Sequence, residues 1–240
     1  MSELLELYKH DLVKAQKADD QQKISLICKK IASVYAEQWQ WDKALEYYVR
    51  SIDVDEQLGN REGIAKSYAS IGNLFYAQKE WDKALMFYTK ELEVEVLRNN
   101  KKGIARAYNN LGTVYAKQGK IDNALESFTQ SIDIKDEIGD IKGKISTYDN
   151  MALVFDMIQE WRKAEEFYTL SYEIKVRLND FVGMAENLWR RAKLYQEQEK
   201  YQETLDLMAQ TISLLEKVKY PDLDHYRRVF NDMLRFVYTQ

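Results

Sequence analysis

The sequence predicts an all-α protein built of tandem helix pairs, and three observations support this fold class. A short motif returns at a fixed offset of 40 residues along the 240-residue chain. One proline and nine glycines leave little to interrupt a helix, and a hydrophobic content of 45% is enough to build a core. Pairs of glycine, asparagine and aspartate punctuate the chain at the same offset. We therefore expect a solenoid of antiparallel helix pairs with about twelve helices.

The repeated motif fixes the register of the array. It reads Trp41-Asp42-Lys43-Ala44-Leu45, Trp81-Asp82-Lys83-Ala84-Leu85, Ile121-Asp122-Asn123-Ala124-Leu125, Trp161-Arg162-Lys163-Ala164-Glu165 and Tyr201-Gln202-Glu203-Thr204-Leu205. Small residues hold another column, namely Ala32, Gly72, Gly112, Ala152 and Ala192. A small residue that recurs in register indicates close contact between helices, so we expect this second column to be buried at helix crossings.

The boundaries of the units follow from the punctuating pairs Gly59-Asn60, Asn99-Asn100, Gly139-Asp140 and Asn179-Asp180. The first residue of each pair accepts the left-handed conformation past a helix end, and the second can cap the next helix. The predicted repeats span residues 21–60, 61–100, 101–140, 141–180 and 181–219. Residues 2–18 and 222–239 are predicted to form an N-terminal and a C-terminal capping helix, with Asp20 capping the first repeat and Pro221 opening the last helix.

The residues at the core of each unit resemble a known repeat family. Tyr108, Leu111, Gly112, Tyr115, Ala124 and Phe128 stand at the spacing of the tetratricopeptide motif, and the resemblance covers about residues 22–217. The units differ from that motif in having 40 residues instead of 34, which is similar to a subclass found in adaptors and in bacterial signalling proteins. The resemblance implies a right-handed superhelix that holds a protein or peptide on its concave face.

Composition and charge argue against several other functions. The net charge of −4 is the wrong sign for a nucleic-acid binder, and no segment approaches the roughly 20 apolar residues of a membrane-spanning helix. Cys28 is the only cysteine, and it falls in a column of aromatic core residues, while His10 and His225 have no evident nucleophile to assist. We predict a cytoplasmic protein that is not an enzyme and uses no metal or cofactor.

The resemblance also implies which residues line the groove, since four columns of the first helix in each pair are exposed there. These columns hold six basic and two acidic residues, a balance of +4 that favours an acidic partner segment. The candidate peptide-binding residues are Lys29, Lys66, Asn73, Arg106, Asn109, Asn110, Asn150, Trp189, Arg190 and Lys193. The amides can bind a peptide backbone and Trp189 can anchor an apolar side chain. The acidic stretches Asp53–Glu56 and Glu91–Glu95 are expected to be solvated helix faces.

Two functional hypotheses follow. In the first, the chain is an adaptor or sensory module that binds a protein or peptide segment of acidic character, in a bacterial signalling system. In the second, it is a self-assembling scaffold that forms homo-oligomers. The second rests on Trp39, a large apolar residue in a turn where the other repeats carry Lys79, Gly119, Gln159 and Glu199.

Overall fold

The computed structural model describes residues 2–239, and over that range it contains twelve α-helices and no strand. The helices are α1 (Ser2–Lys17), α2 (Gln21–Glu37), α3 (Trp41–Gln57), α4 (Arg61–Ala77), α5 (Trp81–Leu97), α6 (Lys101–Lys117), α7 (Ile121–Glu137), α8 (Ile141–Met157), α9 (Trp161–Arg177), α10 (Phe181–Glu197), α11 (Tyr201–Lys217) and α12 (Leu223–Tyr238). The predicted all-α class and the helix count are confirmed.

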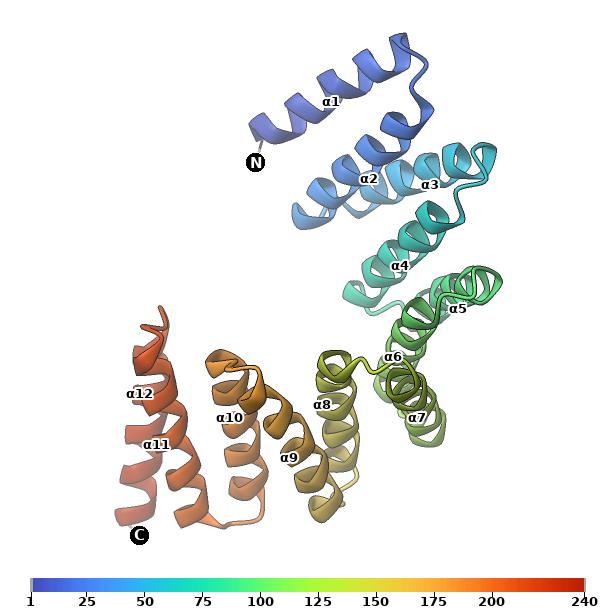
Figure 1. The fold of residues 1–240 in the computed structure, drawn as a ribbon. Coiled ribbons are helices and arrows are strands. Elements are labelled where there is room, and N and C mark those ends of the chain that lie inside the picture. Colours follow the sequence, from blue (N-terminus) through green and yellow to red (C-terminus); the bar gives the residue numbers. More distant parts are fainter. Residues whose placement is uncertain (1, 240) are drawn as a thin grey trace. The chain divides into compact units, whose positions relative to one another are not determined.

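The chain divides into two compact units, with the boundary between Ile134 and Lys135 near the end of α7. In the first unit α2 packs against α3 and α4 against α5, while α1 lies on α2. In the second unit α8 packs against α9 and α10 against α11, while α12 lies on α11. Within each unit the two helices of such a pair run in opposite directions because a short turn joins them, as α4 and α5 and α10 and α11 illustrate (Figure 1).

The turns between repeats have the backbone conformation that the sequence predicts. Gly59, Asn99, Gly139 and Asn179 all have positive φ, between 53° and 66°. In the first of these turns the amide of Asn60 donates to the carbonyl of Asp55 at 2.8 Å, which satisfies an acceptor at the end of α3. Within repeats the same conformation is imposed on residues that do not favour it, including Trp39 with a φ of 60°.

The helix caps agree with the sequence except at Asn100 and at the C-terminal end. Asn100 stands before α6 but makes no side-chain cap hydrogen bond, and its side-chain amide donates to Glu95 at 2.9 Å instead. Asp20, Asn60, Asp140 and Asp180 each accept a hydrogen bond from the backbone amide three residues later. The last helix begins at Leu223 with Asp222 as its N-cap, so Pro221 lies before the helix and does not occupy its first turn. A turn at Pro221 and Asp222 delays the helix by two residues relative to the spacing of the other repeats.

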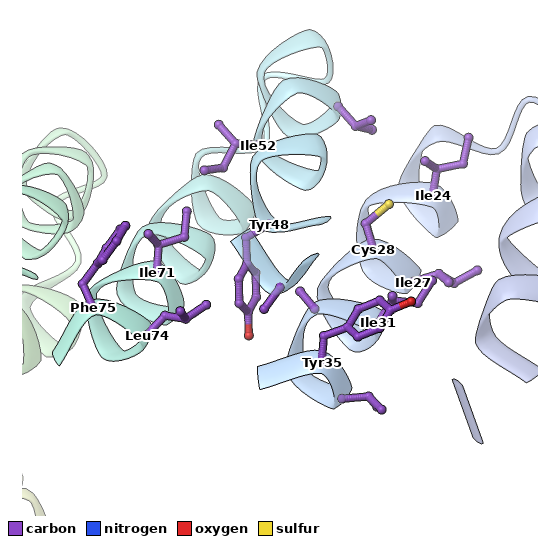
Figure 2. Packing of buried hydrophobic residues seen from close by; sticks show 14 of the residues in the cluster. Ile24, Ile27, Cys28, Ile31, Tyr35, Tyr48, Ile52, Ile71, Leu74 and Phe75 are labelled. Carbon is purple, nitrogen blue, oxygen red and sulfur yellow. The ribbon is translucent and has the colours of Figure 1, made fainter. Parts of the chain in front are cut away.

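The core consists of the predicted columns. In the first unit, α2 contributes Ile24, Cys28 and Ile31 and α3 contributes Tyr48 and Ile52, and their side chains meet between the helices (Figure 2). The small-residue column is buried throughout. At its second member, Gly72, an added Cβ would stand 2.5 Å from the Tyr88 ring, so the close approach of the two helices requires glycine there.

The expectation that the acidic stretches are solvated is wrong at three positions. Asp55, Glu91 and Glu95 are at most 2% exposed, although they alternate with neighbours that face water. Asp55 and Glu95 belong to a column that continues as Lys135, Lys175 and Leu215, all buried. A helix in such an array is covered on two sides, by its own partner and by the next repeat, so positions that look like an outer face are enclosed.

Candidate functional site

The four columns expected to line the groove form one accessible surface on the first helix of each pair, which we call the first-helix face. The columns hold Leu26, Lys66, Arg106, Ser146 and Glu186; Lys29, Ala69, Asn109, Asp149 and Trp189; Lys30, Ser70, Asn110, Asn150 and Arg190; and Ser33, Asn73, Thr113, Leu153 and Lys193. Every one of these residues is partly or fully exposed, whereas the small-residue column on the same helices is almost entirely buried. Because the two units are distinct bodies, the face is described separately in each.

In the first unit, three of the candidate cations are paired with acids of the chain itself. The Nζ atom of Lys29 lies 2.5 Å from Oδ2 of the buried Asp55. Arg106 reaches Oε1 of Glu91 at 2.9 Å and Oε1 of Glu95 at 3.4 Å. These guanidinium and ammonium groups compensate buried carboxylates, so the formal balance of +4 overstates the charge that a ligand would meet.

A third cation, Lys66, forms an exposed pair with Glu62 at 2.6 Å on its own helix. Such a pair contributes little to stability and can exchange for a ligand carboxylate at small cost. Lys66 is therefore the member of this group that is most readily available to a partner.

The candidate amides of the first unit also have internal contacts. Asn73 accepts a hydrogen bond from the Tyr88 hydroxyl at 2.6 Å, which leaves its amide N–H groups for other partners. Burial raises the pKa of Glu91, while Arg106 and Asn110 act in the opposite direction. Asn109 likewise takes part in an interaction within the chain. These side chains are held in place by the protein and are not loosely solvated.

In the second unit, Arg190 and Lys193 of α10 are exposed and form no ion pair with any other described residue. Burial, and after it Asp156, raises the pKa of Tyr168. Arg190 opposes part of this increase, which places it near the Tyr168 hydroxyl. The remaining amide, Asn150, is engaged within the chain. The accessible, unpaired cations of the candidate set thus lie on one helix.

Trp189 differs from its predicted state. Its ring is only partly exposed and packs edge to face against Tyr226 of α12, with 4.8 Å between the ring centroids. The capping helix therefore covers much of the side chain that was expected to be an open apolar anchor. Trp39, by contrast, is 74% exposed. Its ring packs edge to face against Trp41, with 5.2 Å between the ring centroids.

Two acids outside the predicted set extend the face of the second unit, and a buried tyrosine lies near them. Asp156 of α8 and Glu197 of α10 lie further along the same helices, and Tyr168 of α9 is fully buried below them. The Oδ1 atom of Asp156 and the Tyr168 hydroxyl are both buried without a hydrogen-bond partner among the described residues. The helical register of α8 and α10 places the two acids on this side, but only the packing of α9 brings the phenol of Tyr168 near them.

The one cysteine and the potential metal ligands are further candidates for chemistry. Cys28 is fully buried, and burial raises the pKa of its thiol, which opposes formation of the reactive thiolate. Residues 2–239 hold no group of three or more His, Cys, Asp or Glu side chains suited to a metal ion. Within the same range, every helix is too short or too polar to cross a bilayer.

One pocket lies away from the first-helix face. It has a volume of about 530 Å³ and lies in the second unit, between α9 and the turn that joins α10 to α11. Trp161, Tyr195 and Lys200 contribute to its walls. None of the predicted site residues lines it, so we do not connect it with the groove.

Several solved structures share this fold. The structure of BtubC (BKLC) from P. vanneervenii matches with a TM-score of 0.79 at 13% identity, covering 90% of this chain and 91% of that chain. A Rap protein complexed with competence and sporulation factor matches with a TM-score of 0.67 at 16% identity, covering 98% and 70%. The Rap conjugation gene regulator of the plasmid pLS20, in complex with the Phr* peptide, matches with a TM-score of 0.71 at 13% identity. That match covers 92% of this chain and 60% of the regulator.

At these identities the likeness establishes the fold alone. No curated protein matches the sequence. The family model for the tetratricopeptide repeat matches residues 25–94 and 103–175, segments that hold most of the repeated columns. Since the two segments together cover more than half of the 240 residues, the chain belongs to the tetratricopeptide repeat family.

Proposed function

We propose that the chain is a non-catalytic binding module that holds a protein or peptide segment on its first-helix face. The observation that carries this proposal is the contrast between the columns: those of the face are accessible and polar on every repeat, while the packing columns beside them are buried. Lys29, Arg106 and Asn73 also serve the packing of the first unit. Lys66, Arg190 and Lys193, by contrast, compensate no buried charge among the described residues. A partner segment would use such exposed cations and the amides beside them. The peptide complexes of two Rap proteins with the same fold support this direction.

The proposed ligand contacts are those of the candidate set. Arg190 and Lys193 would bind carboxylates, since neither is paired within the described residues, and Lys66 would exchange its exposed partner for one. Asn73, Asn109, Asn110 and Asn150 would contact the ligand backbone, with Lys29 and Arg106 adding positive potential beside them. We keep Trp189 in the set as a partly covered apolar contact. The partner is thus a segment with acidic groups, and a cytoplasmic sensory or adaptor role accords with it.

The test uses peptides selected from a phage-displayed random heptamer library on the immobilised full chain. Isothermal titration of the synthetic peptides into wild type and the Asn110→Ala/Arg190→Ala double variant should show at least a tenfold loss of affinity, about 1.4 kcal/mol. Affinity should also fall with added salt, because the carboxylate contacts are screened. The double variant should remain folded, with a helical circular-dichroism spectrum like that of wild type. Its melting temperature should fall somewhat, because Asn110 helps to compensate the buried Glu91.

The matched control is Arg162→Ala/Lys163→Ala, which removes two exposed cations from α9, on a second-type helix. This variant should bind like wild type. Equal affinities for all three proteins would place the binding site outside the first-helix face.

The exposure of Trp39 is the observation that favours the alternative, a self-assembling scaffold. A tryptophan with 74% of its surface exposed in a turn of positive φ offers an apolar contact between copies of the chain. Sedimentation velocity at several concentrations tests this alternative. A concentration-dependent oligomer that Trp39→Ser abolishes would support the scaffold, and a monomer at all concentrations would remove it.

A further inference from the structure

The first-helix face of the second unit ends in two carboxylates that the described chain does not neutralise. Asp156 lies in the last turn of α8, and Glu197 is the last residue of α10. They interact with each other, since the pKa of Asp156 is raised first by burial and then by Glu197. Neither forms an ion pair with a described basic side chain, whereas the nearby Asp149 is paired with Lys175 at 2.8 Å. We call Asp156 and Glu197 the carboxylate pair.

The position of the carboxylate pair on its helices increases the negative potential there. Carbonyl groups at a helix C-terminus carry a partial negative charge, so a carboxylate in the last turn is unfavourable and a cation is favourable. Both members of the pair stand at such an end. Local helix physics therefore opposes this arrangement, and the fold alone gives no reason for it.

The buried phenol of Tyr168 supplies an independent observation at the same place. Its equivalent in another repeat, Tyr88, donates a hydrogen bond to Asn73 at 2.6 Å. In the repeat of Tyr168 the position of Asn73 is occupied by Leu153, which has no acceptor to offer. The Tyr168 side chain is fully buried, and its hydroxyl makes no hydrogen bond of good geometry within the described residues. Arg190 is nonetheless close enough to lower the pKa of this hydroxyl, both by its charge and by a side-chain contact. Because Asp156 acts on the pKa of this hydroxyl, the phenol lies within electrostatic range of the carboxylate pair.

Comparison of the repeats shows that the acid is particular to this site. The column of Asp156 otherwise reads Ala36, Tyr76, Ala116 and Gln196. A packing requirement shared by all repeats would have produced a similar residue in each. The Asp156 Oδ1 atom is buried and lacks a hydrogen-bond donor, which costs free energy in the free protein unless a donor arrives from outside.

We propose that the carboxylate pair binds a cationic group of the ligand, an ammonium or guanidinium, in the negative potential near the buried Tyr168 side chain. This inference rests on the proposed function and refines it, because a segment with acidic groups alone would be repelled here. Arg190 and Lys193 would bind a carboxylate of the ligand one to two turns back along α10, while the carboxylate pair binds its positive end. The ligand is therefore a segment that carries both charges, and its cationic group would form charge-assisted hydrogen bonds with the carboxylates.

The experiment compares two substitutions with matched controls in the full chain. Asp156→Asn and Glu197→Gln remove one charge each with little change in shape. The controls are Asp206→Asn on α11 and Glu173→Gln on α9, which neutralise exposed acids away from the first-helix face. The probes are heptamers selected from the random library, each also synthesised with an acetylated N-terminus and with norleucine or citrulline in place of lysine or arginine. Titration calorimetry gives the affinities, and thermal denaturation gives the stability.

The proposal expects selected peptides to need one cationic group, and the modified probes identify it as the terminal amine, a lysine or an arginine. Asp156→Asn should weaken binding at least tenfold, Glu197→Gln should weaken it by a smaller factor, and the controls should stay within twofold. Asp156→Asn should also raise the melting temperature, because an unpartnered carboxylate is removed from a helix end. A purely structural Asp156 would lower it.

Three results would overturn the inference. Peptides that lose affinity on Arg190→Ala but bind Asp156→Asn like wild type would leave the proposed function standing and remove the cation site. If the probes that lack the cationic group bind as tightly as the selected peptides, the cation site would likewise be removed while the proposed function stands. A library that yields no binding peptide would remove both the cation site and the proposed function.

Discussion

At the scale of single residues, the buried ionisable column distinguishes this chain from an array packed by apolar groups alone. Asp55 and Glu95 are surrounded by donors, since Asp55 receives hydrogen bonds from Lys29 and Asn60, and Glu95 from Asn100, Arg98 and Arg106. Lys135, in the same column, donates to Thr147 at 2.5 Å. The residue five positions after each charged member of this column depends on the sign of that member's charge. It is asparagine after the two acids and aspartate after the two lysines. The residue at the start of the next helix thus varies together with the charge of the column, although Asn100 makes no side-chain cap hydrogen bond.

The lysine of this column gives a prediction on pH dependence. Burial lowers the pKa of Lys135 to about 8, against the opposing effect of Asp140. The side chain of Lys135 therefore binds its proton more tightly in the unfolded chain than in the folded one, so its positive charge destabilises the fold. This loss of stability is full below pH 8 and is relieved as the pH rises from about 8 towards 10.4. Lys135→Met should raise the free energy of unfolding at pH 7, by up to about 3 kcal/mol. Urea denaturation of both proteins at pH 7 and 9.5 checks this, and an advantage that does not shrink at the higher pH would contradict it.

The small-residue column gives a second prediction at this scale. A Cβ on Gly112 would lie 2.7 Å from the Phe128 ring and 3.1 Å from the Ala124 carbonyl, so the helices would have to separate. Gly112→Leu should cost roughly 1 to 3 kcal/mol by overpacking. Thermal denaturation measures the effect, with Lys102→Leu at an exposed site of the same helix as control. Equal melting temperatures for wild type and Gly112→Leu would show that the crossing is looser than the structure indicates.

At the scale of helices, one contact occurs twice with its charges reversed. Lys29 of α2 pairs with Asp55 of α3, and Asp149 of α8 pairs with Lys175 of α9, in both cases 26 residues apart along the chain. The acid lies on the second helix in one repeat and on the first helix in the other. The geometry of the helix pair therefore accommodates either polarity, provided that the two charges are opposite.

This equivalence predicts the result of a charge swap. Asp55→Lys alone should cost about 3 to 5 kcal/mol, because it places a second ammonium beside Lys29 in a buried position. Adding Lys29→Asp and Asn60→Asp reproduces the arrangement of the later repeat and should recover most of that loss. Urea unfolding of the single and triple variants is the measurement. A triple variant as unstable as Asp55→Lys would mean that neighbouring residues, and not the pair itself, set the polarity.

At the scale of the whole molecule, the end helices close the array. α12 is strongly amphipathic in pattern, and its Met233 packs into a cluster with Ala192, Leu205 and Met208 from α10 and α11. Its outward side is mostly charged or polar. Without this cover the last helix pair would expose its apolar side to water, as terminal repeats do when a cap is missing.

Met233→Asp should therefore destabilise the C-terminal repeat, by roughly 2 to 4 kcal/mol, since it buries an unpaired carboxyl group against that cluster. Trp189 should become more exposed at the same time, because α12 holds Tyr226 against it. Tryptophan fluorescence and thermal denaturation report these two changes. Arg228→Asp, on the exposed side of α12, is the control, and a similar loss there would show that the helix contributes charge and not packing.

The sequence by itself determined the fold class, the twelve helices and their turns, because a period of 40 residues repeats every signal for packing, stopping and capping. The resemblance to the repeat family also implied which columns of the first helices are exposed, and these columns are accessible in the structure. It could not show which charges are buried or paired: Asp55, Glu91 and Glu95 read as solvated, and Trp189 as open. Those outcomes depend on a neighbouring helix that lies 15 to 40 residues away in sequence. Only the tertiary structure brings that helix close, and it thereby decides which polar groups are compensated internally and which are left for a ligand.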